Sequence, residues 1–296
     1  MKYQFMQQHV AQFSVERMSC VFKVSRSGYY RFINAERSAR AQENDRLLTK
    51  IKVIHDASRH TYGSPRIHAE LGCQGETCSR PRVARLMKYA GIQAKMAARY
   101  KVTPRANPKA PAAPNLLMQD FTAKAPNQRW VTDITYVATA QGWLYVAAVL
   151  DLFSRRIVGL SMSATMTTEL VLNALNQAVI HRRPAAGLTH HSDKGSQYTS
   201  KDFRKRLAEH GMLASMSGTG NCYDNAAMES FFHTLKTEHI YFEHYATREH
   251  ARQSIFEYVE VFYNHQRRHS TLGYDSPMAF EHRWAQQQEV SLLAVH

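Results

Sequence analysis

Three carboxylates occupy positions that are typical of a metal-dependent catalytic site. Asp133 lies in the middle of an apolar and aromatic strand, where a charged side chain has to be paired or bound to a metal ion. Asp193 follows a short predicted strand at 188–192, and functional sites collect at such strand ends in α/β sheets. Glu229 lies on a predicted helix at 225–238, away from the apolar stripe of that helix. Taken singly, each acid could also be a capping or surface residue.

Together, the three acids have the chemistry of a magnesium centre. Mg²⁺ prefers hard oxygen ligands and keeps positions open for phosphate oxygens. Two such ions can activate an attacking oxygen and stabilise a leaving oxygen in an in-line displacement. Lys236 shares a predicted helix face with Glu229, where it could hold a substrate phosphate. The pattern therefore indicates phosphoryl-transfer chemistry.

The second half of the chain must fold so that these side chains meet. Its hydrophobic pattern predicts three consecutive strands and then alternating helices and strands. This order predicts an α/β fold with a mixed sheet, in which an antiparallel meander is joined by parallel strands and covered by helices. The predicted strands are 130–137, 143–150, 156–162, 188–192 and 212–216, and the predicted helices are 168–183, 201–211, 225–238 and 247–265. Trp130 points away from the Asp133 face of its strand, which favours core packing over stacking on a base.

Positive charge is concentrated in the first part of the chain. The 296 residues contain 38 Lys and Arg against 24 Asp and Glu, a formal net charge of +14. Residues 1–120 hold 21 basic and 8 acidic residues, whereas residues 121–296 hold 17 and 16. A basic front joined to a near-neutral rear is typical of a polyanion-binding module, and a solvated basic surface is the alternative.

Short helices in the basic part have the arrangement of a helix-turn-helix region. They are predicted at 15–22, 26–34, 41–58, 64–72 and 79–91. A basic second helix after a short turn is what docking in the major groove of DNA requires, although an ordinary amphipathic helix also has a polar face. The residues expected to contact DNA in this region are Arg26, Arg66, Arg80, Arg82, Arg85 and Lys88.

A proline-rich segment separates the two halves. Four prolines between 104 and 114 prevent a helix and disfavour a central strand. We therefore predict a helical region at 1–100, a linker at 101–118, a catalytic core with its C-terminal helix at 119–283 and a tail at 284–296.

Composition excludes several classes of protein. The longest apolar run, 143–150, is far shorter than the roughly 20 residues of a membrane span. The N-terminus lacks the apolar segment of a signal peptide. The four cysteines include no C-x-x-C pair, so a zinc cage has little support and a reducing cytoplasm is expected.

Six strings of sequence resemble a known family. They lie at 24–30, 62–67, 127–136, 191–200, 220–232 and 263–274. The spacing from Asp133 to Asp193 and on to Glu229, with 59 and 35 residues between, is similar to that of DDE transposases and retroviral integrases. The strings resemble the OrfB transposase of the IS-three family of insertion sequences, and the resemblance covers about residues 10–283.

The resemblance implies an RNase H-like core with Asp133, Asp193 and Glu229 as ligands of two Mg²⁺ ions, for which Mn²⁺ is an expected substitute. Lys236 matches the basic residue seven positions after the catalytic Glu. The family cuts the ends of its own mobile element to free a 3′-OH and uses that hydroxyl to attack a second phosphodiester. The enzyme implied is a DNA strand transferase.

The resemblance also implies partners. These are DNA, as terminal inverted repeats and target, further copies of the chain on DNA, and an OrfA protein or an OrfA–OrfB fusion. Arg267 and Arg268 lie in the last matching string and are expected to contact DNA. His265 and His269 have the spacing of a helical metal pair, but no third ligand is apparent. A bacterial cytoplasmic protein associated with the nucleoid is expected.

Two other functions stay open. The chain could be a catalytically inactive DNA-binding regulator from a decayed element. It could also be an RNase H-type nuclease, which typically uses a fourth carboxylate, and Asp151 and Asp224 are the candidates. Asp151 could instead cap a turn, and Asp224 could cap the helix that carries Glu229. The nuclease and the transposase differ in whether the freed 3′-OH is joined to a second DNA.

Overall fold

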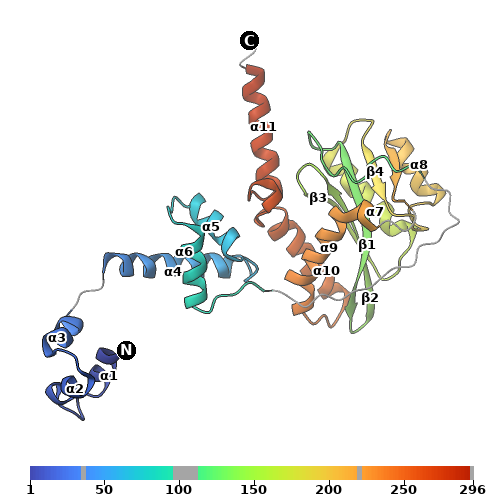
Figure 1. Ribbon diagram of the computed structural model, residues 1–296. Helices are drawn as coiled ribbons and strands as arrows, with labels where there is room; N and C mark the ends of the chain where they lie inside the picture. Colours follow the sequence, from blue (N-terminus) through green and yellow to red (C-terminus); the bar gives the residue numbers. More distant parts are fainter. Residues whose placement is uncertain (35–37, 96–112, 219–221, 294–296) are drawn as a thin grey trace.

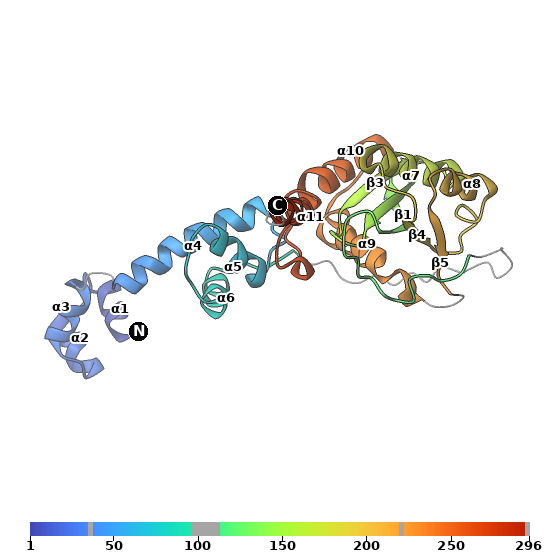
Figure 2. The same ribbon diagram turned by 90° about the horizontal axis from the view of Figure 1, so that it is seen from above.

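The structure, a computed structural model, describes residues 1–34, 38–95, 113–218 and 222–293. Its first six helices are α1 (Lys2–Gln8), α2 (Val15–Phe22), α3 (Arg26–Asn34), α4 (Ala39–Ala57), α5 (Ser64–Cys73) and α6 (Arg80–Tyr89). Helices α1–α3 form one group that lies apart from the rest, and α4–α6 lie between that group and a sheet-containing core (Figures 1 and 2).

The N-terminal helices close around a small apolar centre. Met6, Met18 and Tyr29 are buried together. The Ser14 Oγ accepts a hydrogen bond of 3.3 Å from the Arg17 N–H and so caps α2, as its sequence predicts. Helices α2 and α3 have the predicted bounds, whereas α1, which has no capping side chain, was not predicted.

Helices α4–α6 pack on one another and on the core. Ile51, Ile67 and Val83 belong to the same buried apolar cluster as Val131 of the sheet. Proline stands in the first turn of both α5 and α6, where its missing N–H costs no helical hydrogen bond. Among the described residues, no helix combines the length and apolar character that crossing a bilayer requires.

The core is built on a five-stranded mixed sheet in the order β3-β2-β1-β4-β5. Its strands are β1 (Arg129–Thr139), β2 (Gly142–Asp151), β3 (Ile157–Ser163), β4 (Thr189–Ser192) and β5 (Leu213–Met216). Strands β1–β3 form an antiparallel meander, and β4 and β5 join it in parallel. The α/β fold with a mixed sheet is therefore confirmed.

Helices cover both faces of this sheet (Figure 1). They are α7 (Thr168–Arg182), α8 (Lys201–Glu209), α9 (Ala226–Glu238) and α10 (Arg248–Glu257). Trp130 is fully buried in the cluster that includes Leu175 of α7 and Phe203 of α8, so its predicted core role is confirmed. Val131 lies in the opposite cluster, with Phe231 of α9.

The end of the predicted linker packs on the core. Its residues 101–112 lie outside the described residues, but the rest packs along β5. The Pro114 carbonyl accepts a hydrogen bond of 3.3 Å from the Met216 N–H, and Leu117 is 2% exposed. The Leu116 N–H also donates to the Ser215 Oγ at 2.9 Å, so these two hydrogen bonds attach the end of the predicted linker to the sheet edge.

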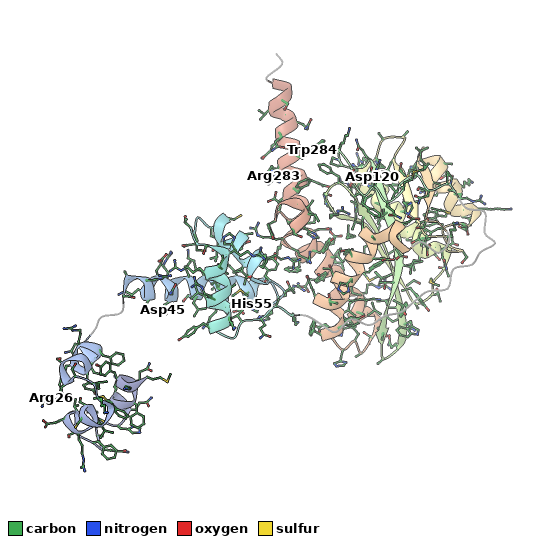
Figure 3. All side chains as sticks on the ribbon, viewed as in Figure 1. Arg26, Asp45, His55, Asp120, Arg283 and Trp284 are labelled. Carbon is green, nitrogen blue, oxygen red and sulfur yellow. The ribbon has the colours of Figure 1, made fainter. Side chains whose placement is uncertain are left out.

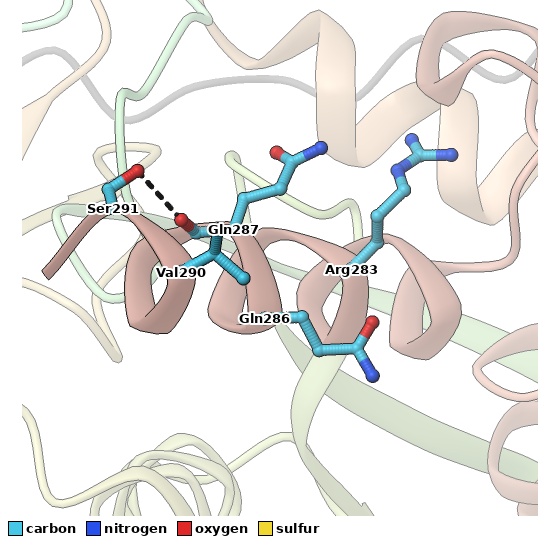
Figure 4. A pocket seen from close by; sticks show the side chains of 5 residues that line it. All are labelled: Arg283, Gln286, Gln287, Val290 and Ser291. Atoms are coloured by element: carbon cyan, nitrogen blue, oxygen red, sulfur yellow. Dashed lines mark hydrogen bonds between the residues drawn. The ribbon is translucent and has the colours of Figure 1, made fainter. Parts of the chain in front are cut away.

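The C-terminal elements also differ from the prediction. One helix was expected at 247–265. In the structure its α-helical part, α10, ends at Glu257, and a π-helical segment, Tyr258–Tyr263, follows directly. The expected tail at 284–296 is helical as far as Leu293, because it continues α11 (Pro277–Leu293). Its residues are mostly good helix formers, and Trp284 packs on Phe153 with ring centroids 5.5 Å apart. A shallow hollow on this helix is lined by Arg283, Gln286, Gln287, Val290 and Ser291 (Figure 4).

Candidate active site

Strand register places two of the acidic residues side by side. Strands β1 and β4 are parallel, and Val131 pairs with His191. Asp133 and Asp193 lie two residues after Val131 and His191, so the same register places them level with each other. Asp193 directly follows β4. Because side chains alternate along a strand, Asp133 shares the face of Val131, which is the face that α9 covers.

The loop after β4 holds Asp193 at this edge. The Asp193 Oδ1 accepts a hydrogen bond of 2.9 Å from the Gly195 N–H. A Cβ on Gly195 would lie 2.9 Å from the same oxygen, closer than real Cβ contacts. Glycine is therefore the residue that lets the loop turn tightly around the carboxylate.

Helix α9 brings Glu229 to the same edge. Strand β4 ends early, so β1 has an open edge beyond Val131. The Asn225 amide nitrogen, at the start of α9, donates to the Thr132 carbonyl on that edge at 3.3 Å. Glu229 lies in the first turn of α9 and is exposed, while Phe231 and Leu235 are buried beneath it.

The electrostatics of these carboxyl groups favour a bound cation. Burial and the charge of Asp193 raise the pKa of Asp133 to about 7, against a hydrogen bond from the Ile134 N–H and the attraction of Lys236. Partial desolvation also raises the pKa of Asp193 and of Glu229, although both residues keep exposed surface. Among the described residues these three groups do not form a set whose oxygens all lie within 4.8 Å. Asp133 and Asp193 are level by register, and the charge of Glu229 acts on Asp133. Carboxylate oxygens are hard donors of the kind that Mg²⁺ prefers.

Lys236 is close to this site but is held by an aromatic side chain. Its Nζ lies 5.0 Å from the ring centroid of Tyr136, which in turn contacts Trp143 at 5.0 Å. Burial lowers the pKa of Lys236, whereas the charge of Asp133 raises it. Tyr136 and Trp143 are both partly exposed, so the cation and two aromatic faces border the site together.

The two candidate fourth carboxylates have structural partners instead. Asp151 is fully buried and accepts hydrogen bonds from the Asn127 N–H at 2.7 Å and the Phe153 N–H at 2.9 Å. It pairs in register with Trp130, three residues from Asp133, and holds the turn after β2. Asp224 accepts from the Gly218 N–H at 2.7 Å and from Asn115, so it ties two loops together.

Three of the basic residues expected to contact DNA lie instead between α5 and the core. Arg267 is buried, and its guanidinium donates to both Glu238 oxygens at 2.7 Å. Arg66 also donates to Glu238, at 3.2 Å. Arg268 donates to Glu70 of α5 at 2.5 Å. These arginines hold α4–α6 on the core, so in this structure their guanidinium groups are engaged within the protein.

Tyr62 and Glu238 also belong to this contact between the helices and the core, although they were not predicted from the sequence. The Arg268 N–H donates to the Tyr62 hydroxyl at 2.8 Å, and that hydroxyl donates to the Gln266 carbonyl at 3.1 Å. The signal was present, because Tyr62 opens one matching string and Gln266 lies in another. Sequence strings far apart in the chain do not reveal that they contact each other.

The remaining basic residues differ in exposure. Arg82 donates to Glu43 and Asn44 at 2.7–3.2 Å, so in this structure α4 engages its guanidinium. Arg26 is exposed and pairs with Glu16 at 3.1 Å. The other three basic side chains of α6 are exposed: Arg80, Arg85 and Lys88.

The two histidines near the C-terminus belong to no metal cluster of the described residues. His265 is exposed. His269 contacts the Tyr263 ring at 4.9 Å, and its Nε2 lies 3.1 Å from the Arg267 guanidinium. Burial and the charge of Arg267 lower the pKa of His269 to about 2.

A mixed sheet, with one acid inside its central strand and a second just after the neighbouring strand, is joined in this chain to a group of helices, and both parts are similar to known proteins. Residues 123–222 and 229–284 match models of the integrase core domain, and residues 42–100 match an HTH-like domain. The chain is 41% identical to transposase InsF for insertion sequence IS3A from Escherichia coli K12, over 96% of this chain and 99% of that protein.

Two further proteins are similar to this chain to different degrees. An uncharacterized 31 kDa protein of insertion element IS600 from Shigella sonnei is 48% identical, over 91% of this chain and 99% of that protein. The HTLV-2 integrase catalytic core domain, solved in complex with magnesium, is 14% identical with a TM-score of 0.40, over 54% of this chain and 99% of that chain. The chain belongs to the IS3 family of insertion-sequence transposases, and this membership supports a role in DNA transposition.

Proposed function

We propose that the chain is a DDE-class transposase, which cleaves DNA at the ends of its insertion sequence and joins the freed 3′-OH to a target phosphodiester. The observation that carries this proposal is the matched register of Asp133 and Asp193 on the sheet face that α9 covers with Glu229. Asp151 and Asp224 have other partners, which disfavours the four-carboxylate nuclease.

In this proposal, Asp133, Asp193 and Glu229 hold two Mg²⁺ ions, with Mn²⁺ as a substitute. Bound Mg²⁺ supplies charge neutralisation at the attacking and leaving oxygens of an in-line displacement. Burial and the negative charges of Asp193 and Glu229 raise the pKa of Asp133, and a bound cation would offset these effects. Lys236, released from the Tyr136 ring, would orient a phosphate beside them.

The experiment is a joining assay on the DNA ends that flank this gene, with the protein alone and with the OrfA portion supplied. Wild type is expected to join ends in Mg²⁺ or Mn²⁺ and to lose joining completely when the metal is chelated. Cleavage that never leads to joining would identify a nuclease. Binding with neither cleavage nor joining, with OrfA and either metal present, would identify a regulator.

We further propose that the exposed face of α6 contacts DNA phosphates. Replacing Arg85 and Lys88 together by Ala is expected to lower affinity for all sequences and to reduce the slope of log K against log[salt] by about 2. The matched control is Arg204→Ala with Lys205→Ala on α8, which removes the same charges from an exposed helix of the core. Equal slopes for the two double variants would place the contact elsewhere.

The active form in this proposal is an assembly on DNA. Both ends of the element have to be held together for strand transfer, so we propose a dimer or larger complex, formed with an OrfA protein or as an OrfA–OrfB fusion. The protein would act on the nucleoid in the bacterial cytoplasm. Light scattering of the joining-competent complex is the check, and an active monomer would contradict it.

A further inference from the structure

A cluster of possible metal ligands lies at the end of α4, outside the acidic site. His55, Asp56 and His60 each offer one ligand atom, and these atoms all lie within 4.8 Å of one another. The Nδ1 atoms of the two histidines are 3.0 Å apart, and the His60 Nδ1 lies 3.5 Å from an Asp56 oxygen. Figure 3 shows His55 at the end of α4 nearer the core.

The hydrogen bonds of His55 aim its lone pair into this cluster. Its Nε2 lies 3.0 Å from the Gln93 carbonyl, which can only accept, so Nε2 carries the proton. The Nδ1 of the neutral ring is therefore an acceptor directed at His60. A histidine that donates one ring N–H to a carbonyl and offers the other nitrogen is the usual arrangement of a metal ligand.

The backbone holds His60 in place for this contact. Arg59 and His60 adopt left-handed conformations with φ of 56° and 62°, which non-glycine residues rarely do. The His60 N–H donates to the His55 carbonyl at 2.9 Å, and the His60 carbonyl accepts from the Lys95 N–H at 2.7 Å. Two successive strained residues persist only where their surroundings stabilise them, and such residues collect at functional sites.

The nearby positive charges are engaged outside the cluster. The Arg59 guanidinium donates to Glu257 at 2.7 Å and lies over the Phe262 ring. The Lys95 ammonium lies 4.4 Å from the ring centroid of Phe242. The Asp56 carboxylate is negatively charged and 71% exposed, so it marks the side of the cluster that faces solvent. A cation could therefore enter from solvent.

We propose that His55, Asp56 and His60 bind a divalent transition-metal ion of the zinc class. Imidazole nitrogens suit Zn²⁺, and three protein ligands leave one position for water. Ligand atoms around a tetrahedral Zn²⁺ lie about 3.3 Å apart, close to the observed separations. His60 would move its proton from Nδ1 to Nε2, so binding requires no net loss of a proton. The ion would join the end of α4 to the left-handed turn at His60, and both histidines are hydrogen-bonded to the segment at 93–95.

The test measures Zn²⁺ binding to the full chain in the presence of excess Mg²⁺, the ion proposed for the acidic site. Wild type is expected to retain about one Zn²⁺ per chain. Replacing His60 by Asn should weaken Zn²⁺ binding at least about tenfold, and Asp56→Asn should do the same. Asn tolerates the left-handed conformation at position 60, and Asp56 is exposed, so both variants should keep the fold, which circular dichroism checks.

Two controls separate this site from others. Glu229→Gln, in the acidic site, should leave Zn²⁺ retention unchanged, and so should His282→Asn, which removes an exposed histidine of α11. Zn²⁺ binding that is equally tight in wild type and His60→Asn would overturn the proposal. Loss of Zn²⁺ in Glu229→Gln with retention in His60→Asn would assign the ion to the acidic site instead.

Discussion

Replacing Glu229 by Gln, or Asp133 by Asn, is expected to reduce DNA joining at least about 1000-fold. Each change keeps the size of the side chain and removes one of the negative charges that would hold the metal ions. Binding of the same DNA should stay within about twofold, because phosphate contacts by basic residues dominate affinity. A joining assay and a gel-shift titration on the same preparations separate the two effects.

The Asp133 variant should also be more stable than wild type without metal. An acid whose folded pKa is raised to about 7 destabilises the folded state once the pH exceeds its unfolded value of about 3.9. The advantage of Asp133→Asn should thus be absent near pH 4 and complete above pH 7, at about 1–3 kcal/mol in unfolding free energy. Asp202→Asn on α8, an exposed acid, is the control. An Asp133 variant that joins DNA normally would remove this residue from the proposed site.

Replacing Arg267 by Ala is expected to lower the free energy of unfolding by about 3–5 kcal/mol, because it leaves Glu238 buried without its bidentate partner. Denaturant unfolding measures this loss. Arg206→Ala, which breaks the exposed pair with Glu209, should cost at most about 1 kcal/mol. A small loss for Arg267→Ala, together with weaker DNA binding, would restore Arg267 as a DNA contact.

The same pair predicts a pH dependence. Burial alone would raise the pKa of Glu238, but its hydrogen bonds and the charges of Arg267 and Arg66 hold that pKa below its ordinary value. The pair therefore stabilises the fold above the unfolded pKa of about 4.3, and its contribution disappears as the pH falls through the folded pKa. The difference between wild type and Arg267→Ala should shrink in acid.

Local patterns in the sequence were enough to predict most elements of this fold. Alternation of apolar residues located the five strands to within about one or two residues, and capping serines located α2 and α3. A charged residue inside an apolar strand also marked Asp133 for attention. These features depend on residues that are close together in the sequence, within one strand or a few helical turns. They can therefore be predicted from the sequence alone.

Which basic residues are available for DNA was decided only by tertiary contacts. Arg85 and Arg82 share a helix and a residue type, yet Arg82 meets Glu43 of α4 and Arg85 remains exposed. Arg268 is bound by Glu70, 198 positions earlier in the chain. Arg267 is 4% exposed and is paired with Glu238 of α9, 29 positions earlier in the chain. An arginine's partner depends on which elements pack together, and no local periodicity records that.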